Sequence, residues 1–277
     1  MKANITNFVN SPIGIFDSGI GGLTLANAIS TLLPNEQLIY FGDTAHLPYG
    51  EKSTAAIQAY TIKIIDVLLK HQCKVILIAC YSASTAAYEL AKEYTASKAK
   101  IISMIEPVIE YLANYANKNI GLIGTRQTIN SGVFEKHLAK LDKNIQLKLL
   151  ATPLLVNMIE EGFFNNNISH SVIEKYLTEP NLQNIDALVL GCTHFPLIRK
   201  EIDAFYQAQQ QNVETIDASM IVAKYLYNYL QTNNLRTNTD QIPIHKFYVS
   251  DYTKSFEAST TLFFGKKVEL QQYKLWE

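Results

Sequence analysis

One short cassette occurs twice in this chain, and each copy ends a hydrophobic run in a cysteine that a hydroxyl residue follows. The first copy covers residues 75–82 and the second covers residues 187–194. Another matched pair of apolar runs, residues 13–18 and 120–125, precedes them, and both pairs are separated by nearly the same number of residues. A repeat on this scale predicts two similarly built halves, each with a thiol in the same place.

Short apolar runs alternate with helix-like segments almost throughout the chain. The fold class that this pattern predicts is α/β, because apolar strands separated by helices are typical of parallel sheets covered on both faces. The predicted strands are residues 13–16, 38–41, 75–79, 101–105, 120–123, 147–151, 188–190 and, more weakly, 214–217. The predicted helices include residues 54–69, 85–92 and 131–141.

The end of the chain differs, because its two predicted strands, residues 245–250 and 267–272, lie in a polar setting. We expect them to close the first sheet. We place the crossovers between the halves near Glu106 and Ala218. The prediction is a discontinuous first domain, residues 1–105 plus 219–277, and a second domain, residues 106–218. Two such α/β domains would hold a ligand in the cleft between them, at the carboxyl ends of their strands.

Composition excludes several classes of protein. Hydrophobic residues make up 48% of the 277 residues and charged residues 18%, which is ordinary for a protein with a full core and argues against disorder. The net charge of −1 offers nucleic acid no basic surface. No apolar run approaches the roughly 20 residues that span a bilayer, and the first nine residues lack the apolar stretch of a secretion signal. We therefore expect a cytoplasmic protein.

The three cysteines show no zinc spacing and no disulfide pattern. A lone strand-end cysteine is usually a small buried hydrophobe. Cys73 has neither a strand-end position nor hydroxyl neighbours, and we expect it to be structural. Cys80 and Cys192 differ because they share one context, with helix starts predicted at Ser84 and Phe195. A helix N-terminus lowers the pKa of a thiol. Two thiols across one cleft could remove a proton from one face of a carbon and return it to the other.

Two further residues could assist these thiols. Asp17 opens a glycine-rich loop, residues 17–22, which could cap a helix or expose backbone N–H groups to an anion. His194 follows Cys192 closely enough to share its proton chemistry. Residues 42–50 indicate only an ordered loop, and residues 160–162 read as a helix end capped by glycine.

Five motifs, taken together, resemble those of glutamate racemases, which are cofactor-independent members of the aspartate/glutamate racemase superfamily. They are residues 16–22, 40–43, 47–50, 123–125 and 191–197, in order and at natural spacing. The resemblance implies two α/β domains related by pseudo-twofold symmetry, with the active site between them. It also implies interconversion of L- and D-glutamate for peptidoglycan synthesis, without a metal or other cofactor. We also expect a homodimer that associates with neither nucleic acid nor membranes.

The resemblance also assigns roles to individual residues. Cys80 and Cys192 match the two acid/base thiols, while Asp17 and His194 match the residues that assist them. Glu160 matches a carboxylate that orients the histidine. The positions that match substrate-binding residues are Asp17, Ser18, Tyr49, Gly50, Tyr81, Ser82, Thr125, Thr193 and His194.

Tyr81 departs from the family pattern, which usually has asparagine there. A large phenol replaces a compact amide that can both donate and accept. We expect the ring to turn toward the cleft edge and to offer only its oxygen to the substrate. The alternatives are a racemase of a shorter amino acid such as aspartate, a one-thiol decarboxylase, a Cys-His hydrolase, or a binding protein that has lost turnover. The last would exchange no Cα proton, and the second thiol counts against the decarboxylase and the hydrolase.

Overall fold

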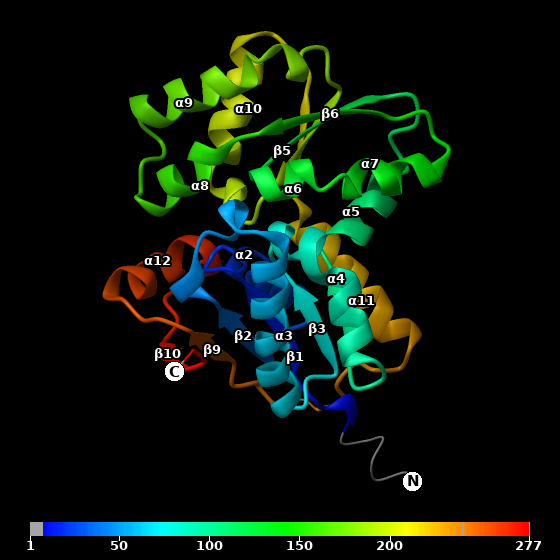
Figure 1. The fold of residues 1–277 in the computed structure, drawn as a ribbon, viewed down its shortest axis with the longest axis vertical. Coiled ribbons are helices and arrows are strands. Elements are labelled where there is room, and N and C mark those ends of the chain that lie inside the picture. The colour runs from blue at the N-terminus through cyan, green and yellow to red at the C-terminus, as the bar shows by residue number, and fades with distance from the viewer. Residues whose placement is uncertain (1–7, 240, 277) are drawn as a thin grey trace.

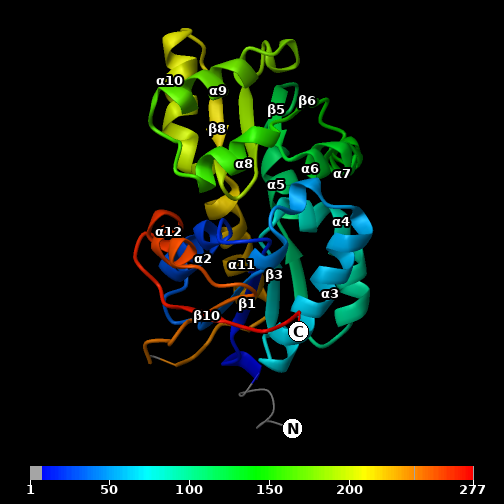
Figure 2. The same cartoon turned by 60° about the vertical axis from the view of Figure 1, so that its left-hand side comes forward.

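The strands form two parallel sheets, one above the other along the length of the molecule, with helices packed around each (Figures 1 and 2). This computed structural model describes residues 8–239 and 241–276. In that part of the chain the larger sheet has the order β10-β9-β2-β1-β3-β4 and the smaller one has the order β6-β5-β7-β8. Both described ends of the chain lie with the larger sheet (Figure 1).

The elements follow one another in a regular alternation of strand and helix. The larger sheet contains β1 (Ile13–Asp17), β2 (Leu38–Gly42), β3 (Val75–Ile78), β4 (Lys100–Ser103), β9 (Lys246–Val249) and β10 (Leu270–Gln272). The smaller sheet contains β5 (Asn119–Gly124), β6 (Gln146–Ala151), β7 (Ala187–Gly191) and β8 (Glu214–Ile216). The α-helices are α2 (Leu23–Leu32), α3 (Thr54–Lys70), α4 (Tyr81–Thr95), α5 (Ile105–Leu112), α6 (Arg126–Asn130), α7 (Val133–Leu138), α8 (Pro153–Glu160), α9 (Asn167–Leu177), α10 (Arg199–Ala208), α11 (Ala218–Thr232) and α12 (Lys254–Phe264).

The two halves repeat one topology. The first four strands are arranged β2-β1-β3-β4, and the next four repeat this arrangement as β6-β5-β7-β8. Strands β9 and β10 extend the first sheet beside β2, as expected for the polar strands near the end of the chain. The α/β prediction with two parallel sheets is confirmed, and β3 and β7, which precede the two cysteines, occupy equivalent places in their sheets.

Burial on both faces explains why the strands of the larger sheet are apolar throughout. Side chains alternate across a strand. Accordingly, Ile13 and Ile15 of β1 belong to one apolar cluster and Phe16 belongs to another on the opposite face. The same alternation holds along β2 and β3. Helices α3 and α4 contact each other on one side, and α2 contacts α11 and α12 on the other.

Three predicted boundaries were wrong. Ile105 begins α5 instead of ending a strand, because β4 ends at Ser103, whose hydroxyl accepts a hydrogen bond from the Ile105 N–H. The predicted helix over residues 131–141 starts at Val133, because Gly132 has a left-handed φ of +69°. Helix α4 begins directly after Cys80, well before Ser84.

The chain passes between the sheets twice. Helix α5 follows the last strand of the first half and leads to β5, and α11 follows β8 and leads back to the larger sheet. These two helices contact each other. The domain limits that we place near residues 106 and 218 lie at the beginnings of these helices and remain predictions.

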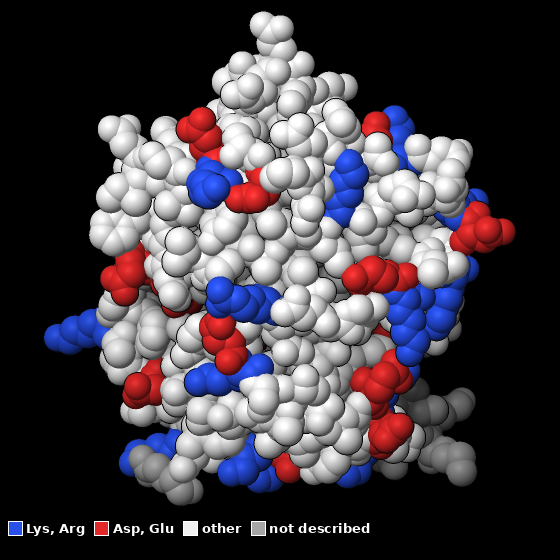
Figure 3. Space-filling model, turned by 45° about the horizontal axis from the view of Figure 1, so that its top comes forward, with Lys and Arg blue, Asp and Glu red and all other residues white. Residues whose placement is uncertain are grey.

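Charged side chains are scattered over the face shown in Figure 3, where Lys and Arg alternate with Asp and Glu. This distribution agrees with the small net charge of the chain. Among the helices of the described residues, none combines the length and apolar character that crossing a membrane requires.

Candidate active site

The carboxyl ends of the strands bring the predicted site residues together. In the larger sheet, Asp17 ends β1 and Cys80 follows β3, which is paired with β1. In the smaller sheet, β5 and β7 are paired so that Gly124 lies opposite Gly191, directly before Thr125 and Cys192. Ends of adjacent parallel strands are where α/β sheets bind ligands.

Cys80 lies in a buried, polar setting. Its backbone forms the N-cap of α4, and its thiol donates to the Ser18 hydroxyl at 3.6 Å. Burial, together with the nearby charge of Asp17, raises the pKa of the Cys80 thiol to about 12. The helix N-terminus therefore does not produce the low pKa that the sequence predicts, because desolvation and a neighbouring carboxylate outweigh it.

Asp17 lies behind this thiol. Its side chain is fully buried, and its Oδ2 accepts a hydrogen bond of 2.8 Å from the Gly22 N–H at the start of α2. Burial raises the pKa of Asp17, although the charge of His194 and the Gly22 hydrogen bond oppose this shift. Asp17 thus caps the start of a helix, which is one of the two roles expected for its loop. Its charge also raises the pKa of Cys80.

The second thiol is connected to an imidazole and a carboxylate. Nδ1 of His194 lies 3.7 Å from Sγ of Cys192, and its Nε2 lies 2.7 Å from Oε1 of Glu160. Burial lowers the pKa of His194, but the hydrogen bonds with Cys192 and Glu160 outweigh it, so the pKa is raised well above 6.5. A protonated His194 places a positive charge beside the Cys192 sulfur.

These residues surround one narrow cavity between the two sheets. Its volume is about 20 Å³, roughly the space of one water molecule. It is lined by Ser18, Leu47, Pro48, Tyr49, Gly50, Cys80, Tyr81, Ser82, Thr125, Val156, Gly191, Cys192, Thr193 and His194. Both thiols and most of the predicted substrate-binding residues are therefore neighbours, while Asp17 and Glu160 lie behind this first layer. A cavity of this volume is too small to hold an amino acid, so the structure describes a closed arrangement of the site.

Close contacts between the two halves explain two glycines. A Cβ on Gly21 would lie 2.6 Å from the His194 ring, and a Cβ on Gly50 would lie 2.6 Å from Cβ of Thr125. In both cases the glycine belongs to the first half and its neighbour to the second. The hydroxyls of Ser82 and Thr125 also meet across the cavity at 2.9 Å.

Tyr81 does not turn toward an exposed edge, so that expectation was wrong. Its side chain is 3% exposed, and its ring stacks on Phe134 of α7 with the centroids 6.3 Å apart. The reason is that α4 begins at Tyr81 itself and directs the ring into the core shared with the second half. Its hydroxyl has no hydrogen-bond partner among the described residues.

Part of the lining was not predicted. Leu47 and Pro48 belong to the loop after β2, and their position beside Tyr49 and Gly50 was the available signal. Val156 comes from α8, and nothing in the sequence distinguishes it from a core residue. A larger hollow of about 450 Å³ between α5, α11 and β8 contains neither thiol. No group of three or more His, Cys, Asp or Glu side chains in residues 8–239 and 241–276 is arranged to hold a metal ion.

Comparison with known proteins agrees with this geometry. Residues 23–226 match the family described as Asp/Glu/Hydantoin racemase. The chain belongs to this racemase family. It is 35% identical to the glutamate racemase of Neisseria meningitidis serogroup C, over 93% of this chain and 94% of that protein. It is 37% identical to the glutamate racemase of Chlorobaculum parvum, over 93% and 94% of the two chains.

Solved structures of racemases have the same fold. The crystal structure of glutamate racemase from Francisella tularensis in complex with D-glutamate is 36% identical, with a TM-score of 0.89 over 97% of this chain and 99% of that chain. A glutamate racemase from Bacillus anthracis gives 29% identity and a TM-score of 0.86. This chain is thus a racemase-type isomerase with the two-domain α/β fold of these proteins.

Proposed function

We propose that this racemase interconverts L- and D-glutamate by proton transfer between two thiols. One thiolate takes the Cα proton and becomes a thiol, and the electron pair remains on the carbon. The thiol on the other side gives its proton to that carbon and becomes a thiolate. The observation that supports this reaction is that Cys80 and Cys192 line one cavity from different sheets, each with its own polar partners.

The surroundings suggest which thiol carries the proton before the substrate binds. The pKa of Cys80 is raised to about 12, so this residue is a thiol near neutral pH and suited to be the acid. Cys192 lies beside His194, whose raised pKa favours the imidazolium that stabilises a thiolate. Cys192 is then the base for one enantiomer, and the other enantiomer requires the opposite distribution of protons. Glu160 holds His194 in place, and Asp17 acts on Cys80 through its charge.

The cavity suits an acidic amino acid. Its described lining contains neither lysine nor arginine, and offers instead the hydroxyls of Ser18, Ser82, Thr125 and Thr193. Helix α4 begins at this cavity, where free backbone N–H groups favour carboxylates. Glutamate is the amino acid in the names of both the Neisseria and the Chlorobaculum relative described above. We extend the proposal to supply of D-glutamate for peptidoglycan, in a cytoplasm that keeps the thiols reduced, by a homodimer.

The test is to incubate the protein with each enantiomer of glutamate and of aspartate in D₂O. We expect either glutamate enantiomer to yield the other, with deuterium at Cα. Chiral chromatography measures the enantiomers, and proton NMR measures the loss of the Cα proton signal. Exchange confined to aspartate would assign the chain to the shorter substrate and overturn the proposal of glutamate. No exchange with any acidic amino acid would identify a binding protein and overturn the proposal.

A further inference from the structure

Asp43 is a buried carboxylate that the proposed reaction does not use. It directly follows β2, one position beyond Gly42, which pairs with Asp17. Its side chain is fully buried. A buried carboxylate is costly unless hydrogen bonds satisfy its oxygens, so its partners indicate what it organises.

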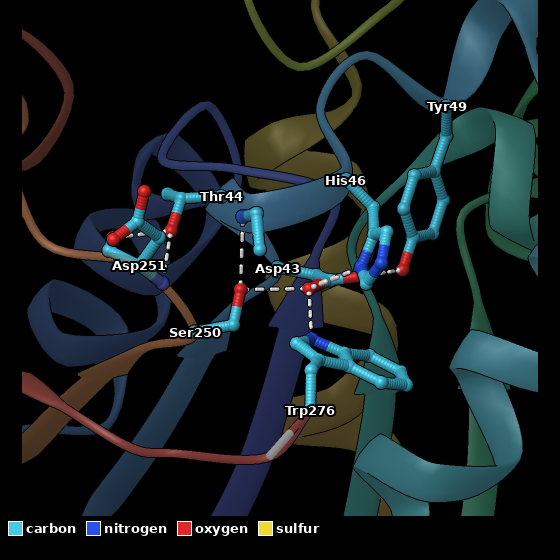
Figure 4. Close-up of polar contacts among 8 residues, drawn as sticks. Asp43, Thr44, His46, Tyr49, Ser250, Asp251 and Trp276 are labelled. Atoms are coloured by element: carbon cyan, nitrogen blue, oxygen red, sulfur yellow. Dashed lines mark hydrogen bonds and ion pairs between the residues drawn. The ribbon is translucent and has the colours of Figure 1, made fainter.

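Four side chains from three separate parts of the chain converge on Asp43 (Figure 4). Oδ1 accepts hydrogen bonds from the Ser250 hydroxyl at 2.7 Å and from the indole N–H of Trp276 at 2.8 Å. Oδ2 accepts one from the Tyr49 hydroxyl at 2.6 Å and lies 3.0 Å from Nδ1 of His46. Ser250 follows β9, while His46 and Tyr49 belong to the loop after β2.

Trp276 is fixed by more than its indole N–H. Its ring meets the edges of His46 and Tyr60, with centroids 4.5 and 5.3 Å away, and Nζ of Lys63 lies 4.8 Å above it. His46 in turn stacks on Tyr60 at 4.0 Å. Trp276 therefore packs against the active-site loop and against α3, which lies behind that loop.

The loop that these groups hold is one wall of the active-site cavity. Leu47, Pro48, Tyr49 and Gly50 line the cavity together with both thiols. The Tyr49 hydroxyl donates to Asp43, so this bond ties a residue of the cavity wall to the buried carboxylate. Any looseness at Asp43 would move this wall, whereas the thiols, fixed by β3 and β7, would stay in place.

We infer that Asp43 and Trp276 are positioning residues, which hold residues 47–50 in the geometry that binds the substrate. The segment that carries Trp276 is thereby part of the active-site architecture. The kinetic part of this inference rests on the proposed racemisation, but the structural part does not. A matched pair of variants separates the two.

Trp276→Phe keeps an aromatic ring and removes the N–H that Asp43 accepts. Tyr273→Phe is the control, because it changes the same segment at a ring that packs on Phe41 and Tyr248 and is not among the hydrogen-bond donors to Asp43 described above. Amide hydrogen exchange of residues 44–51 should quicken in Trp276→Phe and stay unchanged in Tyr273→Phe, with β1 and β3 protected in both. Unchanged exchange in Trp276→Phe would overturn the inference whatever the substrate.

The kinetic measurement distinguishes positioning from general destabilisation. In Trp276→Phe, KM for glutamate should rise by about fivefold, the effect of one lost hydrogen bond, while kcat stays within about twofold of the unaltered protein. Loss of folded protein would lower kcat without raising KM, and that result would also overturn the inference. If the unaltered protein exchanges the Cα proton of another amino acid instead, Trp276→Phe should raise KM for that amino acid and leave kcat nearly unchanged.

Discussion

The two thiols are equivalent in the sequence repeat but lie in different surroundings. Cys80 shares its side of the cavity with Ser18 and the buried Asp17, and Cys192 shares its side with His194 and Glu160. Asp17 acts on Cys80 directly, whereas Glu160 acts on Cys192 through the His194 imidazole. The rates of the two proton transfers should therefore respond differently to substitutions at these residues. Overall kcat/KM cannot reveal this, since two enantiomers of equal energy must have equal kcat/KM in the two directions.

A half-reaction therefore tests the thiols best. Cys80→Ser and Cys192→Ser should each reduce racemisation by several orders of magnitude, because a serine hydroxyl is far less ionised than a thiol near neutral pH and so rarely provides a base. A β-chloro amino acid needs only one base, since loss of the Cα proton expels chloride. Each variant should release chloride from one enantiomer only, and the two variants should select opposite enantiomers.

Chloride release can be measured directly, with the unaltered protein and Cys73→Ser as controls. Cys73 is buried away from the cavity and should be dispensable. If either single variant racemises glutamate at a near-normal rate, or releases chloride from both enantiomers, the division of the two faces between the thiols is wrong.

Tyr81 combines a buried ring with an unsatisfied hydroxyl, which is costly in the absence of substrate. Tyr81→Phe should therefore raise the free energy of unfolding by about 1 kcal/mol. If the hydroxyl binds the substrate, the same change should raise KM by about fivefold. Urea denaturation and steady-state kinetics of this one variant measure both effects.

The asparagine usual in the family provides the contrasting variant. Tyr81→Asn leaves a cavity against Phe134 and should lower the free energy of unfolding by about 3 kcal/mol. A Tyr81→Phe protein that is neither more stable nor weaker in substrate binding would exclude a functional hydroxyl. A shift of preference from aspartate to glutamate in Tyr81→Asn would make Tyr81 a specificity residue.

At the scale of single residues, the sequence predicted what lies at strand ends and missed what depends on packing. Cys80, Cys192 and Thr125 follow apolar strands and could be located from that pattern alone. Val156 gave no such signal, because it lies within α8 and resembles a core residue. Asp43 also follows an apolar strand, but its partners Ser250 and Trp276 come from distant segments that no local pattern connects to it. The orientation of the Tyr81 ring was mispredicted because it depends on the start of α4 at Tyr81 and on Phe134, a residue of the second half.

At the scale of elements, periodicity predicted the strands well and the helix starts less well. Strand β3 ends at Ile78, one residue before the end of the predicted strand, and α4 begins soon after with Cys80 as its N-cap. A helix start that close should lower the pKa of the thiol. Burial and Asp17 reverse this effect, and neither could be read from the local sequence.

The raised pKa of Cys80 predicts that the rate of a reaction with Cys80 as the base depends on pH. In Cys192→Ser the remaining base is Cys80, whose pKa of about 12 means that its thiolate fraction grows with pH throughout the neutral range. Chloride release from the β-chloro amino acid should therefore increase about tenfold per pH unit between roughly pH 7 and 9. Rates measured in buffers of constant ionic strength check this expectation.

Asp17→Asn in the Cys192→Ser background is the companion variant. It removes a charge that raises the pKa of Cys80, so the rise in rate should move to lower pH. A rate for Cys192→Ser that is constant across this pH range would mean that Cys80 is already a thiolate. The assignment of Cys80 as the resting acid would then be wrong.

At the scale of the whole molecule, the duplicated cassette predicted two matching halves, and the identical strand orders explain why the repeat is visible. The closed state of the cavity could not be predicted, because it depends on how the halves meet. Several contacts hold them together at the cavity mouth. Arg126 at the start of α6 places Nη1 3.0 Å from both carboxylate oxygens of Glu51, and Gln127 reaches Thr54.

The ion pair of Glu51 and Arg126 should act as a weak latch on the closed state. Both side chains are about half exposed, so the pair contributes at most about 1 kcal/mol and is screened by salt. Arg126→Gln should raise KM for glutamate by up to about fivefold at low salt, and this difference from the unaltered protein should vanish near 1 M NaCl.

Lys118→Gln is the matched control, because Lys118 forms a similar exposed ion pair with Asp186 at the opposite end of β5. It should leave KM unchanged at every salt concentration. The double variant Glu51→Arg/Arg126→Glu, which swaps the two charges, should restore the KM measured at low salt. The reason is that the latch requires opposite charges on the two halves, whichever half carries the cation. If the exchanged pair stays as impaired as Arg126→Gln, Arg126 acts on the anionic substrate itself, and the mouth of the cavity is an electrostatic entrance instead of a latch.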